Sequence, residues 1–268
     1  MHLVRSFSFH LYSITLLLWC TSSQGESIHI AVASNFTHTM KALISEFEQN
    51  SPHKIKASYG SSGKIYAQIK HGAPFKLFFS ADQSKPLALY NEGLTHSKPF
   101  TYALGGLALW SNNKHFNGEN LESVLLSGEF NKLAIANPKL APYGIAAIEV
   151  LKNMNLVEAT RKKWVRGENI AQTYQFVRTE NADIGFVAFS QIVRQPFYWK
   201  VPSNLYQPIR QDAVLLKHKS EKNGINNKAA LDFIQFLNSL KSQAIIQSYG
   251  YRTENNAYIE LEMSNKNT

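Results

Sequence analysis

The chain has 268 residues, 44% of them hydrophobic, and carries a formal net charge of +9. This length exceeds the usual size of one compact domain, so we expect α/β structure in two parts rather than one. The positive charge does not indicate nucleic-acid binding, because the basic residues are scattered and their densest groups, at residues 161–163 and 217–222, lack interleaved aromatics and match no nucleic-acid motif.

Residues 1–25 have the pattern of a cleaved signal peptide. Arg5 precedes a mostly apolar run at residues 11–20, and small residues at 23–25 offer a cleavage site. The run is too short to span a bilayer. Cys20 is the only cysteine, and the bulky Trp19 before it argues against a lipid anchor. We therefore expect a soluble periplasmic protein without disulfides or a thiol nucleophile.

The mature chain begins with two strand, turn and helix units. Residues 28–33 form a β-type run that stops at Ser34 and Asn35, and apolar residues then recur at helical spacing up to Phe47. Residues 54–59 predict a second strand, after which residues 60–63 break the pattern and a helix restarts. The repetition favours parallel strands covered by helices.

The same alternation continues toward the C-terminus. Further strands are predicted at residues 77–80, 104–110, 133–136 and 183–188, and amphipathic helices at residues 145–154 and 230–237. The fold class that follows is α/β.

Two of the predicted turns carry small polar residues in front of a helix, Ser34-Asn35 and Ser61-Ser62-Gly63. The first turn of a helix has unpaired N–H groups and a partial positive charge, so two such ends that face each other can bind an anion. For any single turn, helix capping is the favoured interpretation. Gly60 and Gly63 add room for a close backbone contact but do not complete a nucleotide-binding loop.

Motifs of catalysis are absent from the sequence. It has no Gly-x-Ser-x-Gly elbow, no His-Glu-x-x-His motif and no paired cysteines, and its nine histidines are dispersed. Asp82 follows a strand, where a cap or hinge role is favoured over that of a catalytic acid. We predict that the protein is not an enzyme and has no cofactor.

Several short motifs, in one order, resemble the molybdate-binding periplasmic proteins of ABC importers. They extend over nearly all of the mature chain, to Tyr251, and comprise residues 33–36, 60–63, 72–74 with 80–82, 137–138 with 141–144, 167–170, 185–188, 212–214 and 249–251. The resemblance implies a two-lobed periplasmic-binding-protein fold of type II, with the ligand in the cleft between the lobes. We expect lobe 1 at residues 26–104 plus 214–268 and lobe 2 at residues 105–213.

The resemblance also implies the ligand and the residues that bind it. Ser34 and Ser62 match serines that hold the oxyanion, and Tyr143 and Ile170 match positions that donate through their backbone N–H groups. The ligand is expected to be molybdate, or tungstate, with molybdenum present only inside the oxyanion and without direct protein ligands. The expected partner is the membrane permease of an ABC importer, and the expected state is a monomer. Another tetrahedral oxyanion, such as sulfate or phosphate, is the alternative ligand.

The sequence also departs from the family at several places. Many relatives have a tyrosine hydroxyl on the strand where this chain has Ala188, so we expect Asn35 to supply a replacement donor. Lys76 stands where relatives often have aspartate, which bears on local electrostatics or docking to the importer. The tail after Tyr251 extends beyond the usual end of the family, without an assigned role.

Overall fold

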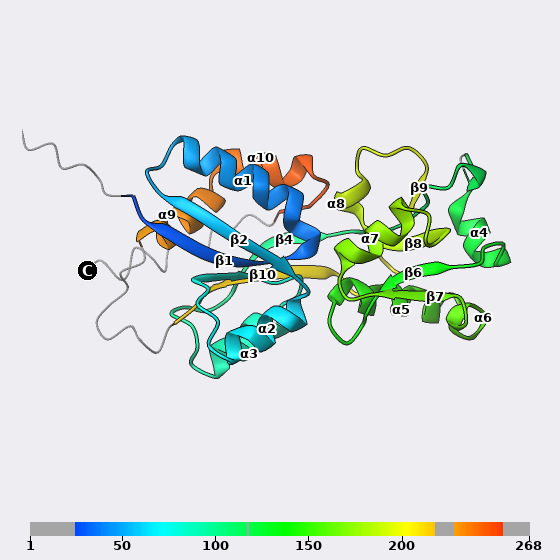
Figure 1. The fold of residues 1–268 in the computed structure, drawn as a ribbon, viewed down its shortest axis with the longest axis horizontal. Helices are drawn as coiled ribbons and strands as arrows, with labels where there is room; N and C mark the ends of the chain where they lie inside the picture. Colours follow the sequence, from blue (N-terminus) through cyan, green and yellow to red (C-terminus); the bar gives the residue numbers. More distant parts are fainter. Residues whose placement is uncertain (1–24, 117, 218–227, 254–268) are drawn as a thin grey trace, which may run out of the picture.

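A computed structural model describes residues 25–116, 118–217 and 228–253. The predicted signal peptide lies outside these ranges except for Gly25, and so does the tail beyond residue 253. The described residues form two α/β lobes that lie side by side (Figure 1). Within them, no helix combines the length and the apolar character that crossing a bilayer requires. The predicted α/β class and two-lobed fold are confirmed.

Lobe 1 is built on a five-stranded sheet of order β2-β1-β3-β10-β4. β1 runs parallel to β2 and β3, whereas β10 pairs antiparallel with β3 and β4. Figure 1 shows α1, α9 and α10 on one face of this sheet and α2 and α3 on the other. The elements are β1 (Ser27–Ala33), β2 (Lys54–Gly60), β3 (Leu77–Phe79), β4 (Phe100–Gly105), β10 (Ile209–Leu215), the short 3-10 helix η1 (Ser34–Phe36), α1 (Thr37–Gln49), α2 (Ser62–Lys70), α3 (Ser84–Asn91), α9 (Lys228–Leu237) and α10 (Leu240–Ser248).

Side chains of β1 enter both cores of lobe 1, because successive residues of a strand point to opposite faces. Ile30 and Val32 belong to the core under α1, α9 and α10, together with Phe233. Ala31 joins the core on the α2 side with Ile65. The continuous apolar run of β1 is thus explained by burial on both faces.

Lobe 2 has a second five-stranded sheet, of order β7-β6-β8-β5-β9. β6 is parallel to β7 and β8, and β5 is antiparallel to β8 and β9. Its elements are β5 (Leu107–Trp110), β6 (Leu133–Ala136), β7 (Trp164–Gly167), β8 (Ile184–Ala188), β9 (Tyr198–Lys200), η2 (Lys114–Phe116), α4 (Leu121–Ser127), α5 (Pro142–Asn153), α6 (Val157–Arg161), α7 (Ile170–Arg178) and α8 (Phe189–Ile192). One core contains residues of α4 and α5, and the other contains residues of α7 and α8.

The chain crosses between the lobes at two places that differ from the prediction. Residues 104–110 were expected to form one strand, but β4 ends at Gly105 in lobe 1 and β5 begins at Leu107 in lobe 2. The predicted return to lobe 1 at residue 214 is wrong, because β10 pairs with β4 from Ile209 onward. Residues 209–213 therefore belong to lobe 1, and the return crossing is residues 201–208.

The strand ends of both lobes bring helix starts to the boundary between them. In lobe 1, β1 and β2 end side by side at Ala33 and Gly60 and lead into η1 and α2. In lobe 2, α5 begins close to the end of β6, since a Cβ atom on Gly144 would lie 2.2 Å from the carbonyl oxygen of Ala136. Only glycine permits this approach, which places the first residues of α5 at the edge of lobe 2.

Candidate functional site

The five residues singled out in the sequence line one small cavity between the lobes. Ser34, Asn35 and Ser62 come from lobe 1, and Tyr143 and Ile170 come from lobe 2. The volume that the centre of a water molecule can occupy inside the cavity is about 10 Å³. The cavity therefore has room for one small group. The remaining lining residues are Ala33, Gly60, Ser61, Ala81, Ala141 and Pro142. The structure thus brings these residues together, and their role as ligands of an oxyanion stays a prediction.

Four helical segments begin at this cavity, two from each lobe. η1 starts at Ser34, α2 at Ser62, α5 at Pro142 and α7 at Ile170. The N–H groups of a first helical turn have no partner inside the helix, and the helix dipole places partial positive charge there. In the described chain, no carbonyl or side chain accepts from the backbone N–H of Ser62, Tyr143 or Ile170. The cavity is therefore surrounded by available neutral donors.

The two serines expected at the site are not the residues that cap the helices. Ser61 caps α2 by accepting from the Lys64 N–H at 3.4 Å, and Asn169 caps α7 by accepting from the Gln172 N–H at 3.0 Å. Ser62 lies one residue inside α2, and Ser34 accepts no capping hydrogen bond through its side chain. The capping interpretation therefore applies to Ser61 and not to Ser34 or Ser62.

The hydroxyl of Ser62 is oriented as a donor. Its Oγ accepts a hydrogen bond from the backbone N–H of Ala81 at 2.9 Å, and the side chain is buried. A hydroxyl that accepts in this way retains its own proton for donation. The Ser34 hydroxyl has no hydrogen-bond partner among the described residues. Both serines can thus donate to a group inside the cavity without adding a charge.

Asn35 does not supply the replacement donor that its sequence position suggested. Its Nδ2 donates to Gln211 Oε1 at 2.8 Å and to the Tyr251 hydroxyl at 3.0 Å, so both amide protons are used within the protein. Its Oδ1 is buried and has no partner among the described residues. In this conformation Asn35 can offer the cavity only its backbone N–H, and the donor missing at Ala188 is not replaced by the amide.

The partners of Asn35 belong to a hydrogen-bond network beside the cavity that joins the two lobes, here called the interlobe network. From lobe 2, the Tyr143 hydroxyl accepts from Gln211 Nε2 at 3.2 Å, and Ser190 Oγ donates to the Asn35 carbonyl at 3.2 Å. Within lobe 1, the Tyr102 hydroxyl donates to Gln211 Oε1 at 3.0 Å. The Tyr251 hydroxyl lies 2.9 Å from Ser190 Oγ, and it donates to the Asn35 carbonyl at 2.9 Å.

Gln211, Ser190 and the hydroxyl of Tyr102 were not predicted from the sequence to belong to the site. The contacts of Gln211 with Asn35 and Tyr143 link residues that are 176 and 68 positions apart in the chain. Local spacing carries no information about such pairs. A glutamine within an otherwise buried strand, as Gln211 is in β10, was the one available signal, because buried amides require hydrogen-bond partners.

The lining of the cavity carries no charge at neutral pH. Among the described residues that line the cavity there is no aspartate, glutamate, histidine, lysine or arginine. Burial raises the pKa of Tyr102 and Tyr143 well above the usual range of a phenol, and it raises the pKa of Tyr251 to about 12. The phenols of the interlobe network therefore stay protonated near neutral pH and keep their hydrogen bonds.

Two other residues that the sequence drew attention to lie outside the cavity. Asp82 accepts from the Lys85 N–H at 3.2 Å, and it forms an ion pair with the Lys85 ammonium group, which agrees with a cap rather than a catalytic acid. Lys76 lies just before β3, where its backbone pairs with His29 and Leu216. Within the described part of the chain, no group of three or more His, Cys, Asp or Glu residues is placed to hold a metal ion.

Comparison with known proteins places this arrangement in a known family. The family model of the bacterial extracellular solute-binding proteins matches residues 28–252. The molybdate-binding protein ModA of Azotobacter vinelandii is 44% identical over 241 residues, which cover 88% of this chain and 93% of that protein. The ModA protein of Rhodobacter capsulatus is 41% identical over 236 residues, covering 87% of this chain and 90% of that protein.

A solved structure agrees with these sequence relatives. The periplasmic molybdate-binding protein of Azotobacter vinelandii superposes with a TM-score of 0.78 at 34% sequence identity. The superposition covers 85% of this chain and 99% of that one, so both lobes are included. The fold is thus that of a family with solved members.

The buried phenols predict a loss of stability at alkaline pH. In the unfolded chain a tyrosine ionises near pH 10, whereas the raised pKa values keep these phenols protonated in the folded protein. The contribution of these phenols to the free energy of unfolding is complete below pH 10. It is lost as the pH rises toward their pKa values in the folded protein. We expect each phenol to cost about 1 kcal/mol of unfolding free energy between pH 10 and pH 11, measured by urea denaturation.

The Tyr251→Phe variant separates this effect from other alkaline titrations. It starts from a lower stability at pH 7, because Asn35 and Ser190 lose a partner. It should then lose about 1 kcal/mol less than the wild-type protein between pH 10 and pH 11. Equal losses in the two proteins would show that the Tyr251 phenol is not shifted by burial.

Proposed function

The chain belongs to the bacterial extracellular solute-binding proteins, and we propose that it captures molybdate in the interlobe cavity and delivers it to an ABC importer. The observation that carries the proposal is the convergence of four helix starts from two lobes on a cavity lined by neutral donors. Similarity to the molybdate-binding ModA proteins supports the choice of ligand. We also propose that residues 1–25 are removed and that the protein is located in the periplasm.

Neutral donors are sufficient to hold a dianion in this cavity. A buried dianion without partners would be strongly disfavoured, so each of its oxygens requires hydrogen bonds. The hydroxyls of Ser34 and Ser62 and the backbone N–H groups of Ser62, Tyr143 and Ile170 supply donors from opposite sides. Hydrogen bonds to a charged acceptor are about twice as strong as neutral ones. The site thus binds negative charge without a lysine or arginine.

Binding and lobe closure are coupled in this arrangement. The donors of Ser62 belong to lobe 1, whereas those of Tyr143 and Ile170 belong to lobe 2, so all of them reach one oxyanion only when the lobes meet. A ligand that contacts both lobes favours the closed conformer through its higher affinity for that conformer. The closed form is what the permease of the importer is proposed to recognise.

The size of the cavity sets the preference among tetrahedral oxyanions. Molybdate and tungstate have longer bonds to oxygen than sulfate, so a rigid cavity fitted to them would hold sulfate with longer and weaker hydrogen bonds. We propose that tungstate binds as well as molybdate, because the two ions are nearly equal in size. Sulfate or phosphate is the alternative ligand. An enzymatic role has no support in the cavity, whose described lining residues include no histidine, aspartate or glutamate that could act as a base.

A thermal melting series with different oxyanions tests the proposed ligand. A ligand at 100 times its dissociation constant stabilises the folded state by about 2.7 kcal/mol. We therefore expect micromolar molybdate or tungstate to raise the Tm of the purified protein by several degrees, and sulfate to leave it unchanged. Equal shifts with sulfate and molybdate, or no shift with molybdate, would contradict the proposal.

The Ser62→Ala substitution tests the site. It removes one donor from the oxyanion, so the affinity for molybdate measured by titration calorimetry should fall by about 1 to 3 kcal/mol. The variant also leaves the Ala81 N–H without its partner, which lowers stability. Ser239→Ala is the matched control, because Ser239 caps α10 and does not line the cavity. The control should lose stability but keep its affinity, and unchanged affinity in Ser62→Ala would place the site elsewhere.

A further inference from the structure

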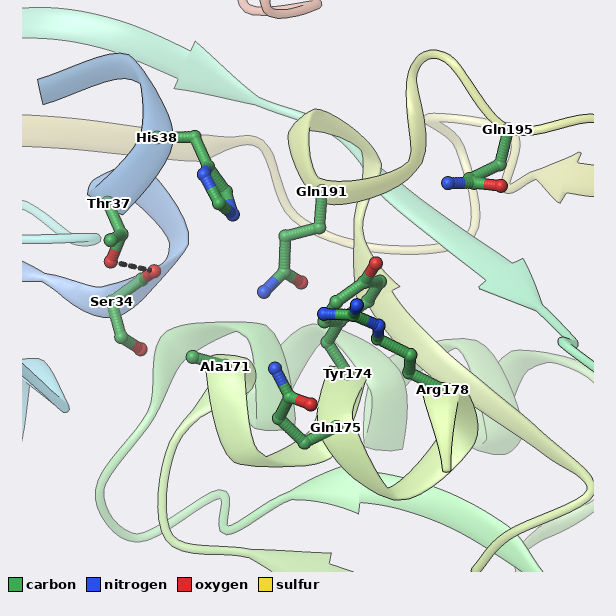
Figure 2. A pocket seen from close by; sticks show the side chains of 9 residues that line it. All are labelled: Ser34, Thr37, His38, Ala171, Tyr174, Gln175, Arg178, Gln191 and Gln195. Carbon is green, nitrogen blue, oxygen red and sulfur yellow. Dashed lines mark hydrogen bonds between the residues drawn. The ribbon is translucent and has the colours of Figure 1, made fainter. Parts of the chain in front are cut away.

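A larger groove lies between the lobes next to the cavity. Its volume is about 450 Å³, and it is bounded by α1 of lobe 1 and by α7 and α8 of lobe 2. The lining residues are Ser34, Thr37, His38, Ala171, Tyr174, Gln175, Arg178, Gln191 and Gln195 (Figure 2). None of these residues is acidic. We refer to this space as the outer groove.

The outer groove and the cavity share a wall. Ser34 lines both of them, and Ala171 of the groove directly follows Ile170 of the cavity at the start of α7. The groove and the cavity are therefore neighbours at the start of α7. Both lobes contribute to this wall, since Ser34 belongs to lobe 1 and Ala171 to lobe 2.

Side chains in the outer groove are free to bind a solute. Figure 2 shows the Arg178 guanidinium and the His38 ring pointing into the groove from opposite sides. Among the described residues, neither side chain has a hydrogen bond or ion pair, and the same is true of the Gln175 amide. Gln191, by contrast, is fixed, since its Oε1 accepts from the Ala188 N–H at 3.0 Å.

Arg178 lies at a distance from which it can attract an anion without holding it in the cavity. α7 runs from Ile170 at the cavity to Arg178 at its other end, and the eight steps of about 1.5 Å between them separate the two Cα atoms by about 12 Å along the helix. The side chain of a helical residue leans toward the helix N-terminus, here toward the cavity. A guanidinium group binds two oxygens of one oxyanion through its planar donors.

We propose that the outer groove is a capture subsite, where Arg178 and His38 collect a tetrahedral oxyanion before it passes Ser34 into the cavity. The inference rests on the proposed function and adds a division of roles to it. The neutral cavity holds the ion, and the cation in the groove raises the rate at which the ion arrives. Electrostatic attraction of this kind acts on the association rate and weakens with salt.

The association kinetics of molybdate test this division. Arg178→Gln should lower the association rate constant about two- to fivefold at low salt, flatten its salt dependence and leave the dissociation rate constant unchanged. Association can be followed by stopped-flow fluorescence, because Trp110 stacks on Tyr174 of the groove with ring centroids 5.2 Å apart. Dissociation can be followed by displacement with excess tungstate.

Arg161→Gln is the matched control for charge. Arg161 lies exposed on α6 of the same lobe, pairs with Glu158 and does not line the groove. Association in this variant should stay close to the wild-type rate. Equal association rates in Arg178→Gln and Arg161→Gln, or an effect of Arg178→Gln on dissociation alone, would overturn the capture subsite while leaving the proposed function intact. Failure of the wild-type protein to bind molybdate would overturn both.

Discussion

The interlobe network is the interaction on which the rest of the site depends. Gln211 and Asn35 of lobe 1 are linked to Tyr143 and Ser190 of lobe 2 by buried hydrogen bonds of 3.2 Å each. Buried polar groups must be paired, so these contacts specify one arrangement of the lobes over others in which a glutamine or tyrosine would lose its partner. That arrangement is the one in which the helix starts face each other across the cavity.

Tyr143 connects the interlobe network to the proposed ligand site. It lines the cavity at the start of α5, and its side chain, almost completely buried, reaches across to Gln211 in the other lobe. A single residue thus joins the donor set of lobe 2 to the contact between the lobes. Outside the cavity the chemistry differs, because Arg178 brings a positive charge to the outer groove. We propose that the charge of Arg178 raises the rate at which the oxyanion arrives and that the neutral donors of the cavity hold it once it is bound.

Much of the fold and part of the site could be predicted from the sequence. The units around Ser34 and Ser62 are local, so spacing and turn residues were enough to place them at helix starts. Which serine caps a helix was not predictable, since Ser61 and Ser62 differ only in their exact position. The role of the Asn35 amide was also missed, because its partners come from residues 211 and 251. The lobe boundary at residue 214 was predicted wrongly for a similar reason, since the pairing of β10 with β4 is a long-range contact.

A crystal of the protein grown with molybdate would test the central claim most directly. Anomalous diffraction recorded above and below the molybdenum absorption edge locates the metal without any assumption about the ligand. One molybdenum peak should lie in the interlobe cavity, within hydrogen-bonding reach, through its oxygens, of Ser34 and Ser62 on one side and of the Tyr143 and Ile170 N–H groups on the other. A closed cavity without molybdenum, or molybdenum bound only elsewhere, would contradict the claim.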